Sequence, residues 1–255
     1  VWTGMITTKR NKVSKFGLIG KDIDYSFSKK FFSEKFEREN LPHTYENFDI
    51  SSIEKFPEII NKTPNLKGLN VTIPYKEKVI PFLDSLAPDA EKIGAVNTIE
   101  ISKNGKLTGY NTDHFGFQKA LEPFLPLQKN TALILGTGGA SKAIAYALQN
   151  LNFDFRFVSR KKGPKTLDYS SLDKLFIENN LLIINSTPLG TFPNIDDCPP
   201  LPYQFITENH LLFDLIYNPA ETEFLERGKL QGAQTSNGLK MLALQAESAW
   251  AIWNS

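Results

Sequence analysis

The chain has 255 residues, enough for one large domain or two modest ones. Lysine and arginine together number 29 and aspartate and glutamate 28, and this net charge of +1 argues against a dedicated nucleic-acid binder. Hydrophobic residues make up 41% and charged residues 22% of the chain, a composition that can bury a core and argues against disorder.

Further classes are excluded by single features. The single cysteine, Cys198, cannot form an intrachain disulfide or a multi-cysteine metal cluster, and the three histidines lack ligand spacing, so we expect no metal site. No apolar run approaches the roughly 18–20 residues of a membrane span. The basic stretch 1–15 has no apolar segment typical of a signal peptide. We therefore expect a cytoplasmic protein without membrane or nucleic-acid partners.

The first half of the chain predicts an α/β unit. Pro74 is tolerated in the first turn of a helix and is expected to open one that runs to Leu83. Asn104-Gly105, which stands between two short apolar runs, predicts a β-hairpin. The alternation of apolar and polar residues predicts strands at 16–20, 43–48, 66–73, 99–101 and 107–109, and helices at 29–40 and 53–61.

The second half predicts a parallel sheet with crossover helices, because apolar strands alternate regularly with helical segments. A domain boundary is expected near residues 112–113, and the cleft between the two halves is the default binding site. The predicted strands are 131–135, 153–158, 181–184, 211–215 and 233–236, and the predicted helices are 114–121, 142–151 and 239–253.

A glycine-rich turn joins the strand at 131–135 to the following helix. Its sequence, Gly136-Thr137-Gly138-Gly139-Ala140-Ser141, is a variant of the dinucleotide-binding motif with serine in place of the third glycine. Gly136 permits the tight turn, Gly138 allows the backbone to approach a pyrophosphate, and the helix N-terminus offers free amides. We therefore expect all six residues to bind a dinucleotide.

The choice between NADP and NAD depends on the residues that follow the next strand. An acid at its carboxyl end would bind the ribose 2′-hydroxyl of NAD. Asp154 stands early in that strand instead, and the carboxyl end carries a cationic turn that suits a 2′-phosphate. The sequence therefore predicts NADP(H), with contacts from Ser159, Arg160 and Lys161.

Several motifs occur in an order typical of one enzyme family. They are Ser26-Phe27-Ser28, Asn70-Val71-Thr72-Ile73-Pro74-Tyr75-Lys76, Ala95-Val96-Asn97-Thr98, Gly109-Tyr110-Asn111-Thr112-Asp113, the run 185–190, the run 214–219, and Asn237-Gly238 with Gln245. At this separation, N-V-T-x-P-x-K and G-x-N-T-D resemble those of the shikimate dehydrogenases. The resemblance covers nearly the whole chain from Phe16 onward.

The resemblance implies reversible reduction of 3-dehydroshikimate to shikimate by NADPH, in chorismate and aromatic amino-acid biosynthesis. It implies that Lys76 is the general acid/base and that Asp113 lies beside it and binds a substrate hydroxyl. Ser26 and Ser28 are implied to hold the substrate carboxylate. The other implied contacts are Asn70, Thr72, Asn97, Tyr217 and Gln245 for the substrate, and Thr187, Leu215 and Gly238 for the cofactor.

Taken alone, several of these residues have ordinary structural explanations. Asp113 could cap the helix that follows it, and Ser26 and Ser28 could cap the helix at 29–40. Gln245 could be a partly exposed residue of the last helix. The serines and Asp113 gain their functional interpretation only from the joint occurrence of the motifs.

The expected architecture has an N-terminal α/β substrate domain (residues 14–112 plus 238–255) and a Rossmann-like, doubly wound NADP-binding domain (residues 113–237), with the active-site cleft between them. A monomer or homodimer is expected. Two alternatives remain: a quinate/shikimate dehydrogenase with relaxed substrate or cofactor choice, and a non-catalytic NADP-binding sensor on the same fold.

Overall fold

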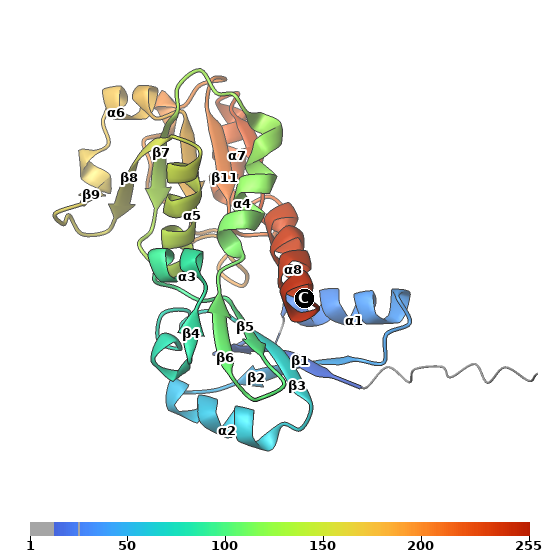
Figure 1. Ribbon diagram of the computed structural model, residues 1–255. Helices are drawn as coiled ribbons and strands as arrows, with labels where there is room; N and C mark the ends of the chain where they lie inside the picture. The colour runs from blue at the N-terminus through green and yellow to red at the C-terminus, as the bar shows by residue number, and fades with distance from the viewer. Residues whose placement is uncertain (1–12, 25) are drawn as a thin grey trace, which may run out of the picture.

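A computed structural model describes residues 13–24 and 26–255, which form two lobes, each built on a sheet (Figure 1). Most of the basic N-terminal stretch, residues 1–12, lies outside the described part of the chain. Every helix of the described residues is too short or too polar to traverse a bilayer.

The first sheet has the strand order β2-β1-β3-β5-β6-β4 and is mixed. β1 pairs in parallel with β2 and β3, whereas β5 pairs antiparallel with β3 and β6. The strands are β1 (Lys15–Gly20), β2 (Thr44–Asp49), β3 (Leu66–Val71), β4 (Ser85–Leu86), β5 (Thr98–Ile101) and β6 (Leu107–Tyr110), and the helices of this half are α1 (Phe27–Arg38), α2 (Phe56–Lys62) and α3 (Pro88–Ile93).

The second sheet is parallel throughout, with the order β12-β11-β10-β7-β8-β9. Numbered from β7 as the first strand, this is the 3-2-1-4-5-6 order of the doubly wound dinucleotide-binding fold read from its other edge. The strands are β7 (Thr131–Leu135), β8 (Asp154–Ser159), β9 (Thr166–Asp168), β10 (Leu182–Asn185), β11 (Leu211–Asp214) and β12 (Gln234–Ser236), and the helices are α4 (Asp113–Leu121), α5 (Gly139–Asn150), α6 (Lys174–Asn179), α7 (Glu223–Leu230) and α8 (Leu239–Trp253).

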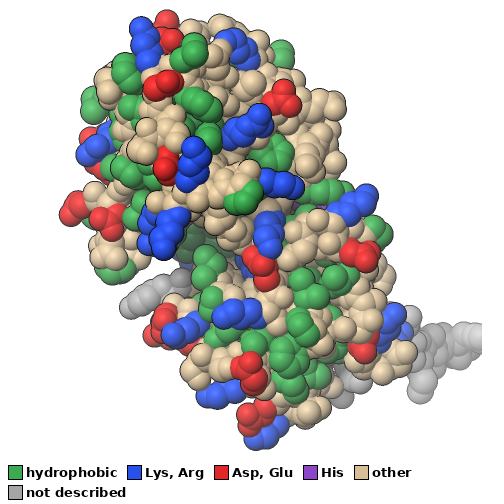
Figure 2. All heavy atoms as spheres, turned by 90° about the vertical axis from the view of Figure 1, so that its left-hand side faces the viewer, with side chains coloured by type: hydrophobic (Ala, Val, Ile, Leu, Met, Phe, Trp, Pro, Cys, Tyr) green, Lys and Arg blue, Asp and Glu red, His purple; other side chains and the backbone are tan. Residues whose placement is uncertain are grey.

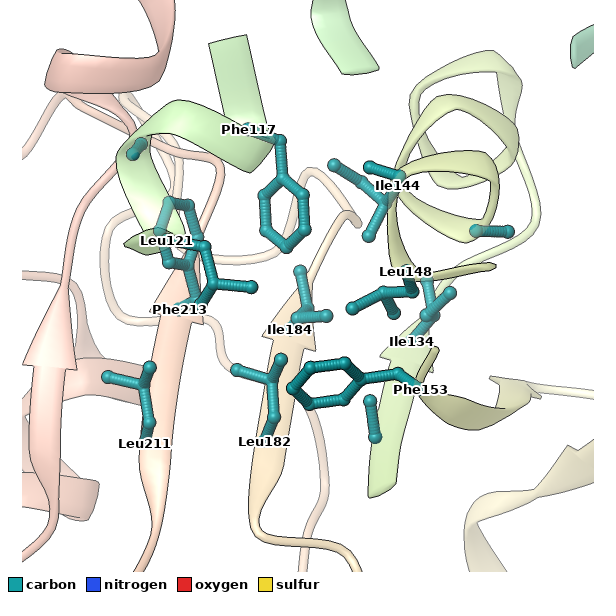
Figure 3. Packing of buried hydrophobic residues seen from close by; sticks show 14 of the residues in the cluster. Phe117, Leu121, Ile134, Ile144, Leu148, Phe153, Leu182, Ile184, Leu211 and Phe213 are labelled. Carbon is teal, nitrogen blue, oxygen red and sulfur yellow. The ribbon is translucent and has the colours of Figure 1, made fainter. Parts of the chain in front are cut away.

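The central strands of the second sheet are continuous apolar runs because helices cover both faces. On one face Ile134 and Ile184 pack against Phe117 of α4 and Leu148 of α5 (Figure 3). Alternate residues of the same strands, such as Leu133, point to the opposite face and pack with α6 and α7. Burial on both faces therefore explains why these strands lack a polar side.

The C-terminal helix α8 returns to the first sheet. Trp253 is 1% exposed and donates its indole N–H to the Ile99 carbonyl at 3.0 Å. Ala246 and Ala249 of α8 share a buried cluster with Phe16 of β1 and Phe32 of α1. Since α8 also packs against α4, it lies beside the junction of the two halves (Figure 1).

Most predicted elements occur within a few residues of their expected bounds, including the hairpin at Asn104-Gly105 and the helix 239–253. The helix expected from Pro74 to Leu83 is wrong. Its first part consists of turns, and only a short 3₁₀ helix (Ile80–Phe82) follows. The Lys76 carbonyl, which would accept an intrahelical bond, instead accepts from the Val96 N–H at 2.7 Å. Other 3₁₀ helices are Ile53–Lys55, Glu122–Phe124, Tyr169–Ser171 and Tyr203–Phe205.

Candidate active site

Lys76 and Asp113 form an ion pair at the junction of the two halves. The distance from Lys76 Nζ to Asp113 Oδ2 is 2.6 Å, and the two side chains are only 15% and 7% exposed. Asp113 Oδ1 accepts a second hydrogen bond from Asn97 Nδ2 at 2.9 Å. An ammonium group held this way can exchange a proton with a bound oxygen while the carboxylate fixes its orientation.

Lys76 owes its position to the turn that follows β3. Tyr75 is buried, donates its hydroxyl to the Ile50 carbonyl at 2.6 Å, and donates its backbone N–H to Thr72. Together with the bond from Val96 to the Lys76 carbonyl, these contacts anchor the backbone on both sides of the lysine. The ammonium group is therefore presented by a turn held by contacts with residues distant in the sequence, and not by the expected helix.

Asn97, Thr112 and Gln245 form a buried polar cluster next to Asp113. Asn97 Nδ2 lies 2.9 Å from Thr112 Oγ1 and 3.3 Å from Gln245 Oε1, and the Thr112 N–H donates to Asn97 Oδ1 at 2.7 Å. Gln245 is 5% exposed and donates to the Leu242 carbonyl, so the alternative of a partly exposed glutamine does not hold. Asp113 begins α4, whose N-cap is Thr112, so its side chain serves the ion pair rather than the cap.

A chain of hydrogen bonds connects α1 to β3. The Ser28 side chain hydrogen-bonds the Tyr45 phenol, which donates to Asn70 Oδ1 at 2.7 Å. Asn70 Nδ2 in turn donates to Thr98 Oγ1 at 3.2 Å. Burial raises the pKa of Tyr45 well above its usual range, so the phenol remains a donor. Ser28 and Asn70 are thereby brought together, through a tyrosine that the sequence analysis missed.

The remaining predicted substrate residues surround this cluster less directly. Ser26 is the N-cap of α1, since its hydroxyl accepts from the Lys29 N–H at 3.1 Å, as the capping interpretation predicts. Thr72 directly follows β3 and donates its N–H to Ile19. Tyr217 comes from the second half of the chain, and its ring packs edge-on against Phe27 with the centroids 5.5 Å apart.

The glycine-rich turn has the geometry that an anion site requires. Gly136 has φ +109°, a value that L side chains rarely adopt. Gly138 is the N-cap of α5 without a side-chain cap, and a Cβ atom added there would meet nothing within 4 Å. The first-turn amides of α5 are therefore open to a pyrophosphate. Ser141 is fully buried, and its hydroxyl lies 2.8 Å from Ser186 Oγ, which ties α5 to the loop after β10.

The turn and the ion pair lie next to each other. A Cβ atom on Gly139 would lie 3.2 Å from Lys76 Cβ, a tight contact that would require Lys76 to shift by a few tenths of an ångström. The next contact between the two segments joins Glu77, one residue after Lys76, to Lys142, three residues after Gly139: Lys142 Nζ and Glu77 Oε2 are 2.6 Å apart. The surface is hollowed between the two lobes, with lysine and arginine side chains around the hollow (Figure 2).

The cationic turn lies at the carboxyl edge of the second sheet, as predicted. β8 ends at Ser159, and Arg160 and Lys161 follow as exposed residues. Asp154 begins β8 and therefore lies at the opposite edge. The cations, and not the acid, are thus next to the glycine-rich turn of the neighbouring strand β7.

Thr187, Leu215 and Gly238 lie beyond the ends of β10, β11 and β12. Asn185 Oδ1 accepts from the N–H and hydroxyl of Thr187 at 3.1 and 2.7 Å. A Cβ atom on Gly238 would lie 2.1 Å from the Leu215 carbonyl oxygen, so this glycine is required by the backbone opposite. Together with the open amides of α5 and the cations after β8, these residues line one sheet edge that fits a dinucleotide.

Comparison with known proteins agrees with this geometry. The family model of the shikimate dehydrogenase substrate-binding domain matches residues 18–99. A curated protein from Clostridium botulinum named shikimate dehydrogenase (NADP(+)) is 40% identical over 248 residues, which cover 93% of this chain and 95% of that protein. The chain belongs to the shikimate dehydrogenase family.

Solved structures of shikimate dehydrogenases have the same fold. The crystal structure of shikimate dehydrogenase 1 from Peptoclostridium difficile is 39% identical and has a TM-score of 0.83, with 94% of this chain and 91% of that chain covered. The enzyme from Thermus thermophilus, in complex with NADP(H) and shikimate, is 30% identical and also has a TM-score of 0.83, with 94% and 93% covered.

Three buried residues near the ion pair and the cofactor edge were not among the residues predicted from sequence. Thr112 stands inside the G-x-N-T-D motif that supplied Asp113, so a signal for it was present. Tyr45 is one of two aromatic residues in the short strand β2, and no motif includes it. Asp214 opens the run 214–219, but its carboxylate partners lie at 185, 216 and 222 and become visible only in three dimensions.

Proposed function

We propose that this chain catalyses the reversible reduction of 3-dehydroshikimate to shikimate with NADPH. The observation that carries the proposal is the 2.6 Å ion pair of Lys76 and Asp113, held against the glycine-rich turn at Gly139. A proton donor and a dinucleotide cradle thus lie on the two sides of one cleft. Both groups are required when a ketone becomes an alcohol.

Lys76 is assigned the role of general acid/base. Its ammonium group gives a proton to the substrate oxygen during ketone reduction and takes it back during alcohol oxidation. Asp113 holds that ammonium group through Oδ2 and is itself fixed by Asn97 through Oδ1. The bound cofactor supplies or accepts the hydride.

The substrate is assigned to the first half of the chain. Hydroxyl groups at the start of α1 suit a carboxylate, which the helix N-terminus also favours. The amide and hydroxyl side chains around Asp113 suit the ring hydroxyls, since they offer both donors and acceptors. The proposed substrate contacts are Ser26, Ser28, Asn70, Thr72, Lys76, Asn97, Asp113, Tyr217 and Gln245.

The cofactor is assigned to the carboxyl edge of the second sheet. The open amides of α5 hold the pyrophosphate, and the exposed cations after β8 favour a 2′-phosphate and hence NADP(H). The proposed contacts are Gly136, Thr137, Gly138, Gly139, Ala140, Ser141, Ser159, Arg160, Lys161, Thr187, Leu215 and Gly238.

The domain division is part of the same proposal. Residues 14–112 with 238–255 form the substrate-binding and catalytic domain, and residues 113–237 form the NADP-binding domain. The two sheets and the return of α8 to the first of them support this division. We propose a monomer or homodimer that acts in the cytoplasm, without nucleic-acid or membrane partners.

The experiment is an assay with 3-dehydroshikimate that follows NADPH absorbance, repeated with NADH and with quinate as the alcohol substrate. We expect turnover with NADPH and much less with NADH or quinate. Lys76→Ala should lower kcat by roughly 10²-fold or more, because general acid catalysis is lost. Exposed Lys78, two residues along the same turn, provides the matched control: Lys78→Ala should keep wild-type activity. Undiminished kcat in Lys76→Ala would contradict the assigned role.

A further inference from the structure

Asp214 is a buried carboxylate without a cationic partner. The residue ends β11 and is 0% exposed. Its oxygens accept from three neutral donors: the Ile216 N–H at 3.0 Å, Asn185 Nδ2 at 3.1 Å and the Thr222 hydroxyl at 2.6 Å. Within the described part of the chain, no lysine or arginine forms an ion pair with it. A negative charge is thus fixed inside the sheet edge and left unneutralised.

The position of Asp214 in the sheet relates it to the dinucleotide edge. It is in register with Asn185, the last residue of β10, and both stand where their strands end. The preceding residues, Ile184 and Phe213, lie on neighbouring strands in Figure 3. The loops that leave from these two ends carry Thr187 and Leu215, two of the residues assigned to the cofactor.

The fold determines which half of a dinucleotide would lie above Asp214. The sheet consists of two mononucleotide-binding halves that meet between β7 and β10. The pyrophosphate turn follows β7 and the cationic turn follows β8, so the adenosine side extends over β8. The nicotinamide side therefore extends over β10 and β11, where the Asp214 carboxylate lies. This step rests on the proposed function.

We propose that the Asp214 carboxylate biases the site toward the oxidised cofactor. The nicotinamide ring carries a positive charge in NADP⁺ and none in NADPH. A buried negative charge near the ring therefore attracts one form and not the other, and the low effective dielectric of the interior strengthens this attraction. Asp214 thus acts through its field, without touching the substrate.

The neutral surroundings of Asp214 support a role beyond structure. Burial raises the pKa of its carboxyl to about 6, against which the three hydrogen bonds act only in part. Above pH 7 the group is ionised at a cost to stability, although an asparagine of equal size would avoid that cost. Features that cost stability in this way are typical of functional sites.

The competing explanation is that Asp214 only organises the two loops through its hydrogen bonds. Loss of loop order would weaken NADP⁺ and NADPH alike, because the two forms differ only in the nicotinamide ring, which gains a hydride at C4 and loses its positive charge on reduction. Loss of the field would weaken NADP⁺ selectively. The ratio of the two dissociation constants therefore separates the explanations, whereas activity alone would not.

The test measures Kd for NADP⁺ and for NADPH by calorimetry at pH 8, with the full chain and with Asp214→Asn. We expect the ratio Kd(NADP⁺)/Kd(NADPH) to rise at least roughly threefold in the variant, the size of effect that a charge about 10 Å away would have at an intermediate dielectric. Asp154→Asn is the matched control. It removes an exposed acid at the start of β8, on the sheet edge opposite the proposed cofactor site, and should leave the ratio unchanged.

The outcomes separate this inference from the proposed function. Wild-type protein that binds neither form would refute the proposed function itself. If the wild type binds both forms but the ratio Kd(NADP⁺)/Kd(NADPH) is unchanged or lower in Asp214→Asn, the proposal that the Asp214 charge favours NADP⁺ is wrong. If Asp214→Asn does not fold, Asp214→Ser replaces it, since it also removes the charge and retains a polar group.

Discussion

Two buried acids near the cleft differ in how their charge is balanced. Asp113 is paired with Lys76 at 2.6 Å, and breaking such a pair leaves the partner charge buried. Asp214 has only neutral donors, so burial opposes its ionisation and no nearby cation among the described residues offsets that effect. The first acid is expected to contribute to binding and proton transfer, and the second to impose a pH-dependent cost on the fold.

That cost can be measured as a change in stability with pH. The pKa of Asp214 is raised from 3.8 to about 6 by burial. Between these values the folded state binds more protons than the unfolded state, so the contribution of this group to stability falls as the pH rises. The stability contributed by protonated Asp214 is fully present below about pH 4 and is lost above about pH 6.

Asp214→Asn should therefore gain stability relative to wild type as the pH increases. Between pH 4.5 and 7.5 the difference in unfolding free energy should move in favour of the variant by about 2 kcal/mol, as measured by urea unfolding. The asparagine amide can still pair with the Thr222 hydroxyl, which accepts as well as donates. A difference that stays constant between the two pH values would show that the carboxyl titrates normally.

Among the helices and strands, the N-terminus of α5 has a glycine, Gly138, that could be replaced by alanine without backbone strain or a steric clash. Gly138 has φ −81°, so alanine can adopt its conformation, and the added Cβ would meet nothing within 4 Å. Gly138→Ala should therefore leave the unfolding free energy within about 0.5–1 kcal/mol of wild type. The methyl group would occupy the approach to the first-turn amides, so the affinity for NADPH should fall by roughly tenfold or more.

The measurement is a calorimetric titration with NADPH, accompanied by a thermal melt. Gly163→Ala is the control, because a Cβ atom there would make only an ordinary contact with Thr166, at 3.8 Å. It should bind NADPH as the wild type does. Unchanged affinity in Gly138→Ala would mean that the pyrophosphate does not approach this turn.

The elements also show why sequence predicts some parts of this fold and not others. The strands of the second sheet were predictable because burial on both faces leaves continuous apolar runs such as 131–135. The prediction of a helix at Pro74 was wrong because the Val96 N–H donates to the Lys76 carbonyl, and the local sequence gives no sign of that hydrogen bond. The short helices α3, α6 and α7 were missed, although Thr222 and Asp173 cap two of them.

The candidate site was predictable to the extent that its residues stand in motifs. Lys76, Asn97 and Asp113 each belong to a short run of specific sequence, and the structure brings all three together. Tyr45 and Asp214 act through partners far away in the chain, which depend on how the strands pair. Their contributions could be seen only once the sheets were assembled.

In the molecule as a whole, α5 contacts the first half on one side of the junction, while α4 packs against α8 on the other. Tyr146 of α5 donates its hydroxyl to Asp89 of α3 in the first half, and within the second half its ring stands edge-on to His114 of α4 with the centroids 5.2 Å apart. Lys142 of the same helix pairs with Glu77 on the surface. These contacts hold the glycine-rich turn in place next to Lys76.

Tyr146→Phe should loosen this attachment while keeping the ring packed against His114. One hydrogen bond is worth roughly 0.5–1.5 kcal/mol, which corresponds to a fall of about two- to tenfold in kcat if the loss appears in the positioning of Lys76. Kd for NADPH should not change, because the cofactor edge remains intact. Steady-state assays and calorimetric titration measure the two quantities separately.

The exposed ion pair provides the comparison for this prediction. Lys142→Met cuts the contact to Glu77 between the same two segments, but both side chains are about 40% exposed, and pairs of that kind contribute little. We expect its kcat within twofold of wild type. If Tyr146→Phe behaves like Lys142→Met, the hydroxyl does not set the geometry of the cleft. If Lys142→Met has the larger effect, the surface pair does so instead.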